Sequence, residues 1–494
     1  MKFSLTTPIY YVNGAPHIGH AYTTIAGDVI AQYRRLLGDD VFYLTGTDEN
    51  AQKNVEASGG SSREDVQAYV DKMSGIWEET WKRLHISHDD FIRTTEARHI
   101  EFVEQFWKKV EAKGDIYKGT YEGLYCTGCE AYKTEAELAQ GLCPDHKRAP
   151  EKLSEENYFF KLSAYRERLL DYIEAHPEFI QPVSRRNEIV SYIRDFAGDF
   201  SISRKNLEWG IPVPGDLSQT IYVWFDALIN YISADPSRWP VDLHLVGKDI
   251  IKFHCAYWPA MLMSAGYELP KTVFAHGFFT IDGEKMSKSL GNVIDPVELV
   301  KHYGNDVVRF HLLREIPFGS DGDFSTQRLV DRYNGELGND LGNLLQRTLT
   351  MTEKFCEGKA PAIHAPLSSG LGNPWNTYTQ AMETFRLHDA LEMAWSVIRW
   401  MNAVIDEKKP WAMAKEGRQD DIDEVIYTLL ESLRMVAWML RPFMPETSTK
   451  MLASLGFDED VILKTTFLEA QVWGGLPEGQ IIRKGEPLFP RLEN

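Results

Sequence analysis

The sequence predicts an α/β protein in which a Rossmann-like domain with a parallel sheet is split by an insertion and followed by an α-helical bundle. Strand-like and helix-like segments alternate near the start of the chain and again after residue 216, and a stretch rich in cysteine, glycine and tyrosine separates them. After residue 325 nearly every segment has helical periodicity. The predicted parts are 1–115, the first half of the parallel-sheet domain; 116–215, the insertion; 216–324, the second half; and 325–494, the bundle.

The first half begins with a strand at 3–12, a turn at 13–16, a helix at 18–37 and a strand at 41–45. Apolar or small residues recur along one face of the helix, and Asn-Gly-Ala-Pro is typical of a turn. Because strands that alternate with helices form parallel sheets, we expect ligands to bind at the C-terminal ends of these strands.

The α/β pattern returns at 220–224 and 243–246, so the stretch between the two halves interrupts one domain. In the C-terminal region, large apolar residues recur three and four positions apart, which is typical of helices in a bundle. They are Leu329, Tyr333, Leu337, Leu341 and Leu345, then Leu391, Trp395 and Ile398, then Leu429, Leu433, Val436 and Leu440. The stretch 360–374, rich in Pro, Gly and Ser, is predicted to be a loop.

The formal net charge of −19 disfavours binding of nucleic acid through the overall field of the protein. Contact with a polyanion would have to use local basic pairs, each of which is equally explained as an ordinary solvated charge pair. These pairs are Arg185-Arg186, Arg204-Lys205 and Lys408-Lys409. Five cysteines in 494 residues argue against a disulfide framework, and neither a membrane span nor a secretory signal is recognisable. We therefore expect a cytoplasmic protein.

Four potential metal ligands occur in the insertion with the spacing of a zinc knuckle. Cys126 and Cys129 form a C-x2-C pair, and Cys143 and His146 follow as C-x2-H. Thiolates and imidazole in two such pairs are typical of a structural zinc site, in which four protein ligands leave no position for water. The alternative is a set of reduced thiols without metal. The sequence thus predicts a zinc-containing insertion.

Two strings about 265 residues apart point to phosphate chemistry. One is His17-Ile18-Gly19-His20 at the predicted start of a helix, and the other is Lys285-Met286-Ser287-Lys288-Ser289. A reaction at the α-phosphorus of a nucleoside triphosphate needs positioning and charge neutralisation, which imidazoles, lysines and a helix N-terminus supply. Histidines in a first helical turn are also common as surface caps, so the lysine string is the more specific signal.

With these strings, the chain resembles the methionyl-tRNA synthetases, a family of class I aminoacyl-tRNA synthetases, over almost its whole length. The matching strings are 8–13 (PIYYVN), 17–20 (HIGH), 45–49 (TGTDE), 223–228 (VWFDAL), 247–250 (GKDI), 253–254 (FH), 258–260 (WPA) and 285–289 (KMSKS). The two phosphate-binding strings, 17–20 and 285–289, indicate only class I. The tryptophan-containing strings and the single zinc knuckle indicate the methionine enzyme.

The resemblance implies that methionine is activated with ATP and Mg²⁺ to methionyl-adenylate and pyrophosphate, and that the methionyl group then passes to the terminal adenosine of tRNA(Met). It implies catalytic roles for His17, His20, Lys285 and Lys288, which would stabilise the phosphates in the transition state. The same four residues would bind ATP together with Gly19, Gly247 and Asp249, and Asp249 would hold the ribose.

The resemblance also implies a methionine pocket. Asp48 would bind the ammonium group, paired with Arg204. The side-chain slot would be lined by Ile9, Tyr11, Trp224, Ala227, Leu228, Tyr231, Phe253 and His254. Aromatic edges suit a polarisable thioether, which supports this set. The alternative for Trp224 alone is packing in the core.

Three residues of the helical region are implied to read the anticodon: Asn343, Arg347 and Trp411. Stacking on an indole ring and hydrogen bonds to base edges are the usual means of reading unpaired bases. Without the resemblance, Asn343 and Arg347 are explained as a plain polar helix face, and Trp411 as a packing residue of the bundle.

One departure from the family concerns Asn50-Ala51, where the family commonly has His-Gly. We expect a monomer, because the chain ends soon after the bundle. Two rival hypotheses remain: another class I synthetase or adenylate-forming nucleotidyltransferase, and a non-catalytic tRNA-binding paralogue. The latter is disfavoured because all four predicted phosphate ligands are present.

Overall fold

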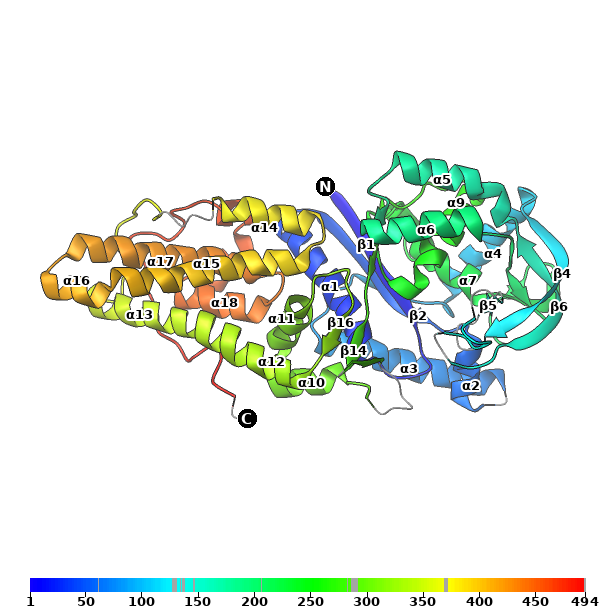
Figure 1. Cartoon of the computed structure of the whole chain (residues 1–494), viewed down its shortest axis with the longest axis horizontal. Coiled ribbons are helices and arrows are strands. Elements are labelled where there is room, and N and C mark those ends of the chain that lie inside the picture. The colour runs from blue at the N-terminus through cyan, green and yellow to red at the C-terminus, as the bar shows by residue number, and fades with distance from the viewer. Residues whose placement is uncertain are drawn as a thin grey trace. The chain divides into compact units, whose positions relative to one another are not determined.

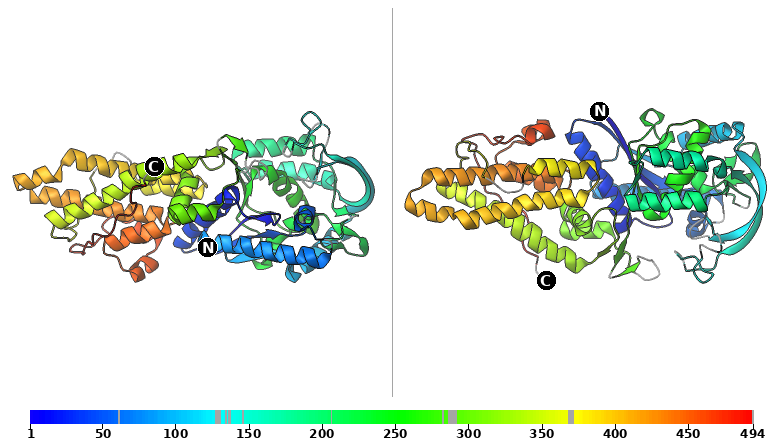
Figure 2. Two further views of the ribbon diagram at one scale, coloured as in Figure 1. Left: turned by 90° about the horizontal axis from the view of Figure 1, so that it is seen from below. Right: turned by 45° about the horizontal axis from the view of Figure 1, so that its top comes forward.

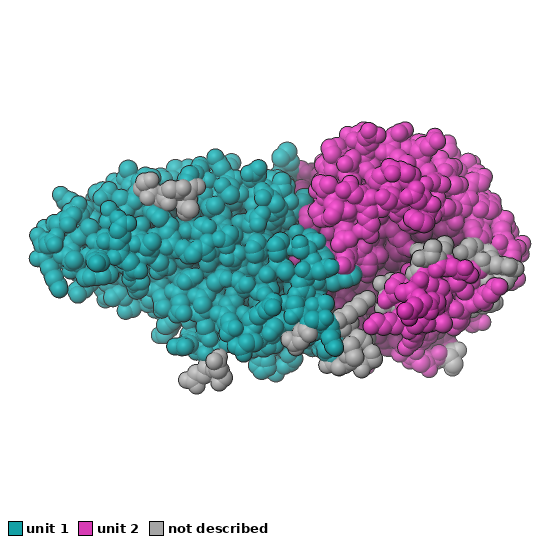
Figure 3. All heavy atoms as spheres, viewed as in Figure 1, with its two compact units in different colours: residues 1, 28–40, 277–494 teal, residues 2–27, 41–276 magenta. Residues whose placement is uncertain are grey.

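The structure is a computed structural model that describes residues 1–494 except 61, 127–130, 134, 136–137, 145–146, 206, 282, 286–291, 368–371 and 493–494. The chain forms two compact units (Figure 3). The first unit comprises residue 1, residues 28–40 and residues 277–494; the second comprises residues 2–27 and 41–276. Among the described residues, no helix is long and apolar enough to cross a membrane.

The centre of the second unit is a six-stranded sheet whose strands are ordered β3-β2-β1-β12-β13-β7. Strands β1 and β2 of this sheet are labelled in Figure 1. The bounds are β1 (Lys2–Tyr11), β2 (Asp40–Asp48), β3 (Asp90–Arg93), β7 (Ile180–Gln181), β12 (Leu243–Gly247) and β13 (Thr272–His276). Strand β1 pairs in parallel with β12, with Leu5 opposite Leu243. Two segments more than 230 residues apart therefore form one sheet, as predicted for a split α/β domain, and the predicted α/β class with a parallel sheet is confirmed.

Helix α1 (Ile18–Leu36) follows β1 through the predicted turn. Ile18, Ile25 and Val29 on this helix are fully buried, which accounts for the apolar periodicity of the sequence. Helices α3 (Arg63–Arg83) and α4 (Ala97–Ala112) follow β2 and β3, and α9 (Trp258–Ala265) precedes β13. A buried hydrophobic cluster, with Phe106, Trp107 and Trp258 among its members, combines residues of α4 and α9 with residues of β2, β3 and β13.

The range predicted as the insertion contains a four-stranded sheet with the order β5-β4-β6-β8. Its strands are β4 (Ile116–Cys126), β5 (Ala131–Lys133), β6 (Glu151–Phe160) and β8 (Phe200–Ser201), and it also includes α5 (Arg166–Ala175) and α6 (Val183–Asp195). One feature was not predicted: β7, inside this range, pairs with β13 and forms an edge of the large parallel sheet. A strand of two residues has no detectable periodicity, so the sequence contains no signal for it. The exact domain boundaries stay a prediction.

A small three-stranded sheet follows, formed by β9 (Ser203–Arg204), β10 (Pro212–Val213) and β11 (Asp216–Ile221). It leads into two short helices, α7 (Val223–Leu228) and α8 (Asn230–Ser233).

The first unit is mainly helical, as predicted for the C-terminal region. It starts with the sheet of β14 (Phe279–Ile281), β15 (Glu284–Lys285) and β16 (Gly322–Phe324), and with α10 (Pro296–Tyr303) and α11 (Asn305–Glu315). A helical run then passes through α12 (Thr326–Arg332), a π-helical segment (Tyr333–Gly342) and α13 (Asn343–Phe355).

The remaining helices are α14 (Pro374–Glu383), α15 (Leu387–Lys408), α16 (Pro410–Glu416), α17 (Gln419–Leu440), α18 (Pro445–Ser454), α19 (Glu459–Lys464) and α20 (Phe467–Ala470). Helices α15 and α17 lie side by side in every view (Figures 1 and 2). Leu391, Trp395, Ile398, Leu429 and Leu433 are all fully buried, so the predicted apolar positions form the core of this bundle.

A buried ion pair lies within the first unit. The Arg309 guanidinium, 1 % exposed, donates to Asp28 at 2.7 Å and to the carbonyl oxygens of Pro442 and Phe443 at 2.9 and 2.8 Å. It thereby joins α1, α11 and the junction of α17 with α18. The replacement Arg309→Ala removes the guanidinium from the buried Asp28 carboxylate, and we expect it to lower the free energy of unfolding by about 3–5 kcal/mol.

Chemical denaturation measures this loss, with Arg328→Ala as the matched control. Arg328 also forms an ion pair, but its side chain is 56 % exposed, so its removal should cost at most about 1 kcal/mol. Equal losses in the two variants would contradict the role assigned to Arg309.

Candidate functional site

The His17–His20 string lies where predicted, at the start of α1, and residues 12–16 separate it from the end of β1. The two imidazole rings stack with centroids 3.6 Å apart. Nδ1 of His17 accepts a hydrogen bond from the Gly19 amide at 3.1 Å, and Nδ1 of His20 accepts one from the His17 amide at 3.2 Å. Because Nδ1 is the acceptor in both rings, the neutral imidazoles carry their protons on Nε2, which is suited to donate to an anion.

The lysine string lies largely outside the described residues. Lys285 ends the short strand β15, and Lys288 belongs to the segment 286–291, which the structure does not describe. Gly247 ends β12, and Asp249 is exposed in the single 3₁₀ turn Lys248–Ile250 that follows. Asp249 is therefore at the C-terminal end of a central strand, the usual position of ligand-binding groups in parallel sheets.

A pocket in the second unit brings together residues from four separate segments. It is lined by Pro8, Ile9, Tyr11, Asp48, Trp224, Ala227, Leu228, Tyr231, Ile250 and His254. Seven of the residues implied for the methionine side chain, and Asp48, lie in this lining. Phe253 does not, but its ring stacks on Trp224 with centroids 3.7 Å apart and so supports the pocket wall. Pro8 and Ile250 were not predicted to line the pocket, although both belong to matching strings, 8–13 and 247–250.

Burial and hydrogen bonding determine the state of His254. Desolvation lowers the pKa of His254 to about 4, so the ring is neutral at pH 7. Nδ1 donates to the Ile250 carbonyl oxygen at 3.0 Å, which leaves Nε2 to accept from the Tyr231 hydroxyl at 2.7 Å. The polar atoms at this side of the pocket are thus paired with each other, and the pocket presents an uncharged, largely aromatic wall.

Asp48, at the end of β2, is 4 % exposed. It is the only acidic residue in the described lining, and with His254 neutral the lining contains no other charge. Arg204, implied as its partner, is not part of the lining. The Arg204 guanidinium donates to Ser201 Oγ at 3.0 Å and to the Ser203 carbonyl at 2.8 Å, and it lies 4.1 Å from the centre of the Tyr222 ring.

Of the four predicted zinc ligands, Cys126 and Cys143 are described, and both are buried, 4 % and 0 % exposed. Cys129 and His146 lie outside the described residues. Within the described part of the chain, no three potential ligands gather at one point. Cys126 and Cys143 are the first residues of the two predicted ligand pairs, and the zinc site stays a prediction.

The predicted anticodon residues belong to one region of the first unit. Asn343 is exposed at the start of α13, and Arg347 donates to Asp406, near the end of α15, at 3.1 Å. Trp411 is 42 % exposed in α16, directly after the Lys408–Pro410 turn. This exposure argues against the alternative that Trp411 only packs within the bundle.

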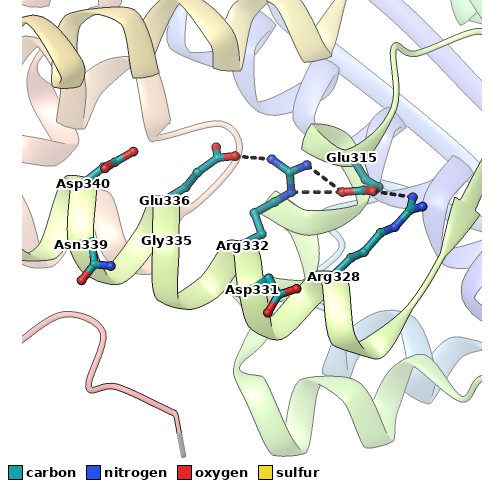
Figure 4. A pocket seen from close by; sticks show the side chains of 8 residues that line it. All are labelled: Glu315, Arg328, Asp331, Arg332, Gly335, Glu336, Asn339 and Asp340. Carbon is teal, nitrogen blue, oxygen red and sulfur yellow. Dashed lines mark hydrogen bonds and ion pairs between the residues drawn. The ribbon is translucent and has the colours of Figure 1, made fainter. Parts of the chain in front are cut away.

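A second hollow, in the first unit, was not predicted from the sequence. It is lined by Glu315, Arg328, Asp331, Arg332, Gly335, Glu336, Asn339 and Asp340 (Figure 4). Glu315 accepts from Arg328 at 3.1 Å and from Arg332 at 2.7 Å, and Arg332 also pairs with Glu336. The arginines are neutralised by these carboxylates, so the hollow has no free positive charge for a phosphate.

Comparisons with known proteins agree with this architecture. Residues 3–152 and 145–349 match the family model "tRNA synthetases class I (M)", and residues 357–494 match "Anticodon binding domain of methionyl tRNA ligase". The methionine–tRNA ligase of Thermotoga maritima is 45 % identical over 512 residues, which cover 100 % of this chain and 81 % of that protein. The enzyme of a Synechocystis species is 44 % identical, covering 99 % of this chain and 98 % of that protein.

Among solved structures, Mycobacterium tuberculosis methionyl-tRNA synthetase in complex with methionyl-adenylate superimposes with a TM-score of 0.92 at 39 % identity, covering 99 % of this chain and 100 % of that chain. The parallel sheet, the histidine string at the start of α1 and the helical C-terminal region together define a class I aminoacyl-tRNA synthetase. Within that class, the chain belongs to the methionyl-tRNA synthetase family. Its activity is that of a methionine–tRNA ligase.

Proposed function

We propose that the pocket formed by Asp48, Trp224, Tyr231 and His254 binds L-methionine. The observation that carries this assignment is the composition of the lining. It combines a single buried carboxylate with an uncharged slot lined mainly by aromatic and aliphatic side chains. The carboxylate suits the ammonium group of an amino acid, and the slot suits a thioether, which gains from contact with aromatic edges.

The proposed reaction starts with attack of the methionine carboxylate on the α-phosphorus of ATP. Asp249 holds the ribose, and Gly19 and Gly247 allow the nucleotide to approach the backbone closely. The Nε2–H groups of His17 and His20 stabilise charge on the phosphates as pyrophosphate leaves, and Lys285 and Lys288 bind the β- and γ-phosphates. Magnesium bound to ATP supplies further charge neutralisation.

In the second step, the 3′-terminal adenosine of tRNA(Met) attacks the carbonyl carbon of methionyl-adenylate, and AMP leaves. We propose that the chain acts as a monomer in the cytoplasm, where ATP, methionine and tRNA are available.

Pyrophosphate exchange measured with each of the twenty amino acids tests the substrate assignment. We expect exchange with methionine to exceed that with every other amino acid. Exchange supported by another amino acid and not by methionine would show that the chain is a different class I synthetase, and no exchange with any of them would favour the non-catalytic paralogue.

We propose that Asn343, Arg347 and Trp411 read the anticodon. The half-exposed Trp411 ring offers a stacking surface for a base, and one base–aromatic stack contributes about 1–3 kcal/mol. The variant Trp411→Ala should therefore lower kcat/KM for tRNA about 10- to 100-fold and leave pyrophosphate exchange unchanged.

Aminoacylation assays measure this effect, with Leu468→Ala as the control, because Leu468 is another exposed apolar residue of the first unit, 66 % exposed. A parallel loss of exchange and aminoacylation in Trp411→Ala would instead indicate a role in folding.

We further propose one structural Zn²⁺ held by Cys126, Cys129, Cys143 and His146. Elemental analysis of the purified chain should find about one zinc per chain, and Cys143→Ser should release it. Metal-free protein whose stability is unaffected by a chelator would refute this site.

A further inference from the structure

A buried polar network lies next to the methionine pocket and was not predicted from the sequence. The Asp226 carboxylate accepts from the Asn50 amide at 2.7 Å and from Nε2 of His99 at 2.6 Å. Nδ1 of His99 lies 2.7 Å from Ser233 Oγ, which is also 3.3 Å from the Asn230 carbonyl oxygen. Asn50 donates in addition to the Thr94 carbonyl oxygen at 3.2 Å.

The network is sealed from solvent. His99 and Asp226 are 0 % exposed, and Asn50 and Ser233 are each 5 % exposed. The contacts from Asp226 through His99 to Ser233 have the connectivity of a catalytic triad, but the Ser233 hydroxyl is buried and cannot reach a substrate. Leaving such groups without partners would cost about 1–3 kcal/mol each. The pairing of both His99 nitrogens, both Asp226 oxygens and the Asn50 side-chain nitrogen therefore indicates that these residues hold a defined geometry.

The residues of the network are directly connected to three walls of the pocket. Asn50 follows two residues after Asp48, whose carbonyl oxygen accepts from Asn54 at 2.9 Å. Asp226 lies on α7 between Trp224 and Ala227, which line the pocket, and Ser233 lies on α8 two residues after Tyr231.

Helix α7 has only six residues and no side-chain cap, so its own hydrogen bonds cannot hold it in place. Asp226 ties this helix on one side to the Asp48 segment through Asn50, and on the other side to α4 through His99. The distance between the carboxylate of Asp48 and the aromatic slot is thereby set by a chain of short hydrogen bonds.

We infer that Asp226, His99 and Asn50 are positioning residues for methionine: they hold the ammonium-binding carboxylate and the thioether slot at a separation that matches one amino acid. The inference rests on the proposed methionine pocket. The three residues do not touch the substrate. Their effect is exerted through Asp48 and through Trp224, Ala227 and Tyr231.

The kinetic test uses Asp226→Ala, Asp226→Asn and Asn50→Ala in pyrophosphate exchange, with concentrations corrected by active-site titration. Asp226→Ala and Asn50→Ala should raise KM for methionine about 10- to 100-fold, as expected for a displacement of about 1 Å, and should leave KM for ATP within about twofold. The double variant should resemble the worse single variant, because both changes break one connection.

Asp226→Asn is the conservative rescue. Its carbonyl oxygen can accept from Asn50, and its amide can donate to His99, which then takes the other tautomer and donates to Ser233. KM for methionine in this variant should stay within about threefold of the wild type.

Tyr378→Phe is the control for simple destabilisation, since it removes a buried hydrogen bond to Met439 in the other unit and should leave KM for methionine unchanged.

A rise in KM that is confined to methionine and rescued by asparagine supports the inference. Unchanged KM for methionine in correctly folded Asp226→Ala or Asn50→Ala overturns it, as does an equal rise for ATP. If Asp226→Ala does not fold, Asn50→Ala and Asp226→Asn decide between these outcomes. Pyrophosphate exchange by the wild type with methionine tests the proposed function separately. Failure of the proposed function can therefore be distinguished from failure of the inference about the positioning residues.

Discussion

Lys288→Ala should slow the formation of methionyl-adenylate about 100- to 1,000-fold while KM for methionine changes little. The reason is that an ammonium group on the β- and γ-phosphates acts mainly on charge that develops as pyrophosphate leaves, and interactions that strengthen in the transition state affect kcat. Removal of one such electrostatic contact typically costs a factor of this size.

Single-turnover kinetics with ATP and methionine measure this step directly. Lys301→Ala is the matched control, because Lys301 on α10 is another lysine of the first unit, with a side chain 70 % exposed, and it should behave as the wild type. A variant Lys288→Ala that forms adenylate at the wild-type rate would show that Lys288 does not contact the triphosphate in the transition state.

Asp48→Ala should lower kcat/KM for methionine about 1,000-fold and leave KM for ATP nearly unchanged. Asp48 is the only acidic group among the described residues of the lining, and the surrounding side chains offer the methionine ammonium no second anionic partner. Loss of one member of a buried charge pair costs about 2–5 kcal/mol, which corresponds to a factor of about 30 to 5,000 and includes the expected loss.

Asp48→Asn separates charge from shape, because it keeps the side-chain volume and one acceptor oxygen. It should recover little of the loss, since an amide does not neutralise an ammonium group. The control Asp235→Ala removes a carboxylate at an exposed turn of the same unit and should leave both KM values unchanged. Near-normal methionine kinetics in Asp48→Ala would exclude Asp48 as the ammonium ligand.

Much of the α/β domain could be predicted because its elements are long and periodic. The strand predicted at 3–12 is β1 (Lys2–Tyr11), and the helix predicted at 18–37 is α1 (Ile18–Leu36). The zinc knuckle could be proposed from spacing alone, whereas its complete ligand set lies partly outside the described residues. Strand β7 could not be predicted, since two residues carry no pattern and its pairing with β13 is a tertiary contact.

The lining of the pocket could be named from the matching strings, because each string contributes a short contiguous piece of wall. The hydrogen-bond network of Asp226, His99, Asn50 and Ser233 could not be predicted in this way. His99 and Ser233 are single polar residues in otherwise ordinary helical segments, and the contact between Asn50 and Asp226 joins positions 176 residues apart. The one available signal was Asn50 itself, which departs from the usual residue of the family and proves to donate to Asp226.

A crystal structure of the chain with a non-hydrolysable methionyl-adenylate analogue will show whether methionine lies between Asp48 and the aromatic slot. We expect the ammonium group within hydrogen-bond distance of the Asp48 carboxylate, and the thioether within about 4 Å of Trp224, Ala227 or His254. An analogue bound with its amino acid outside this pocket, or with its ammonium group away from Asp48, would refute the proposed methionine site.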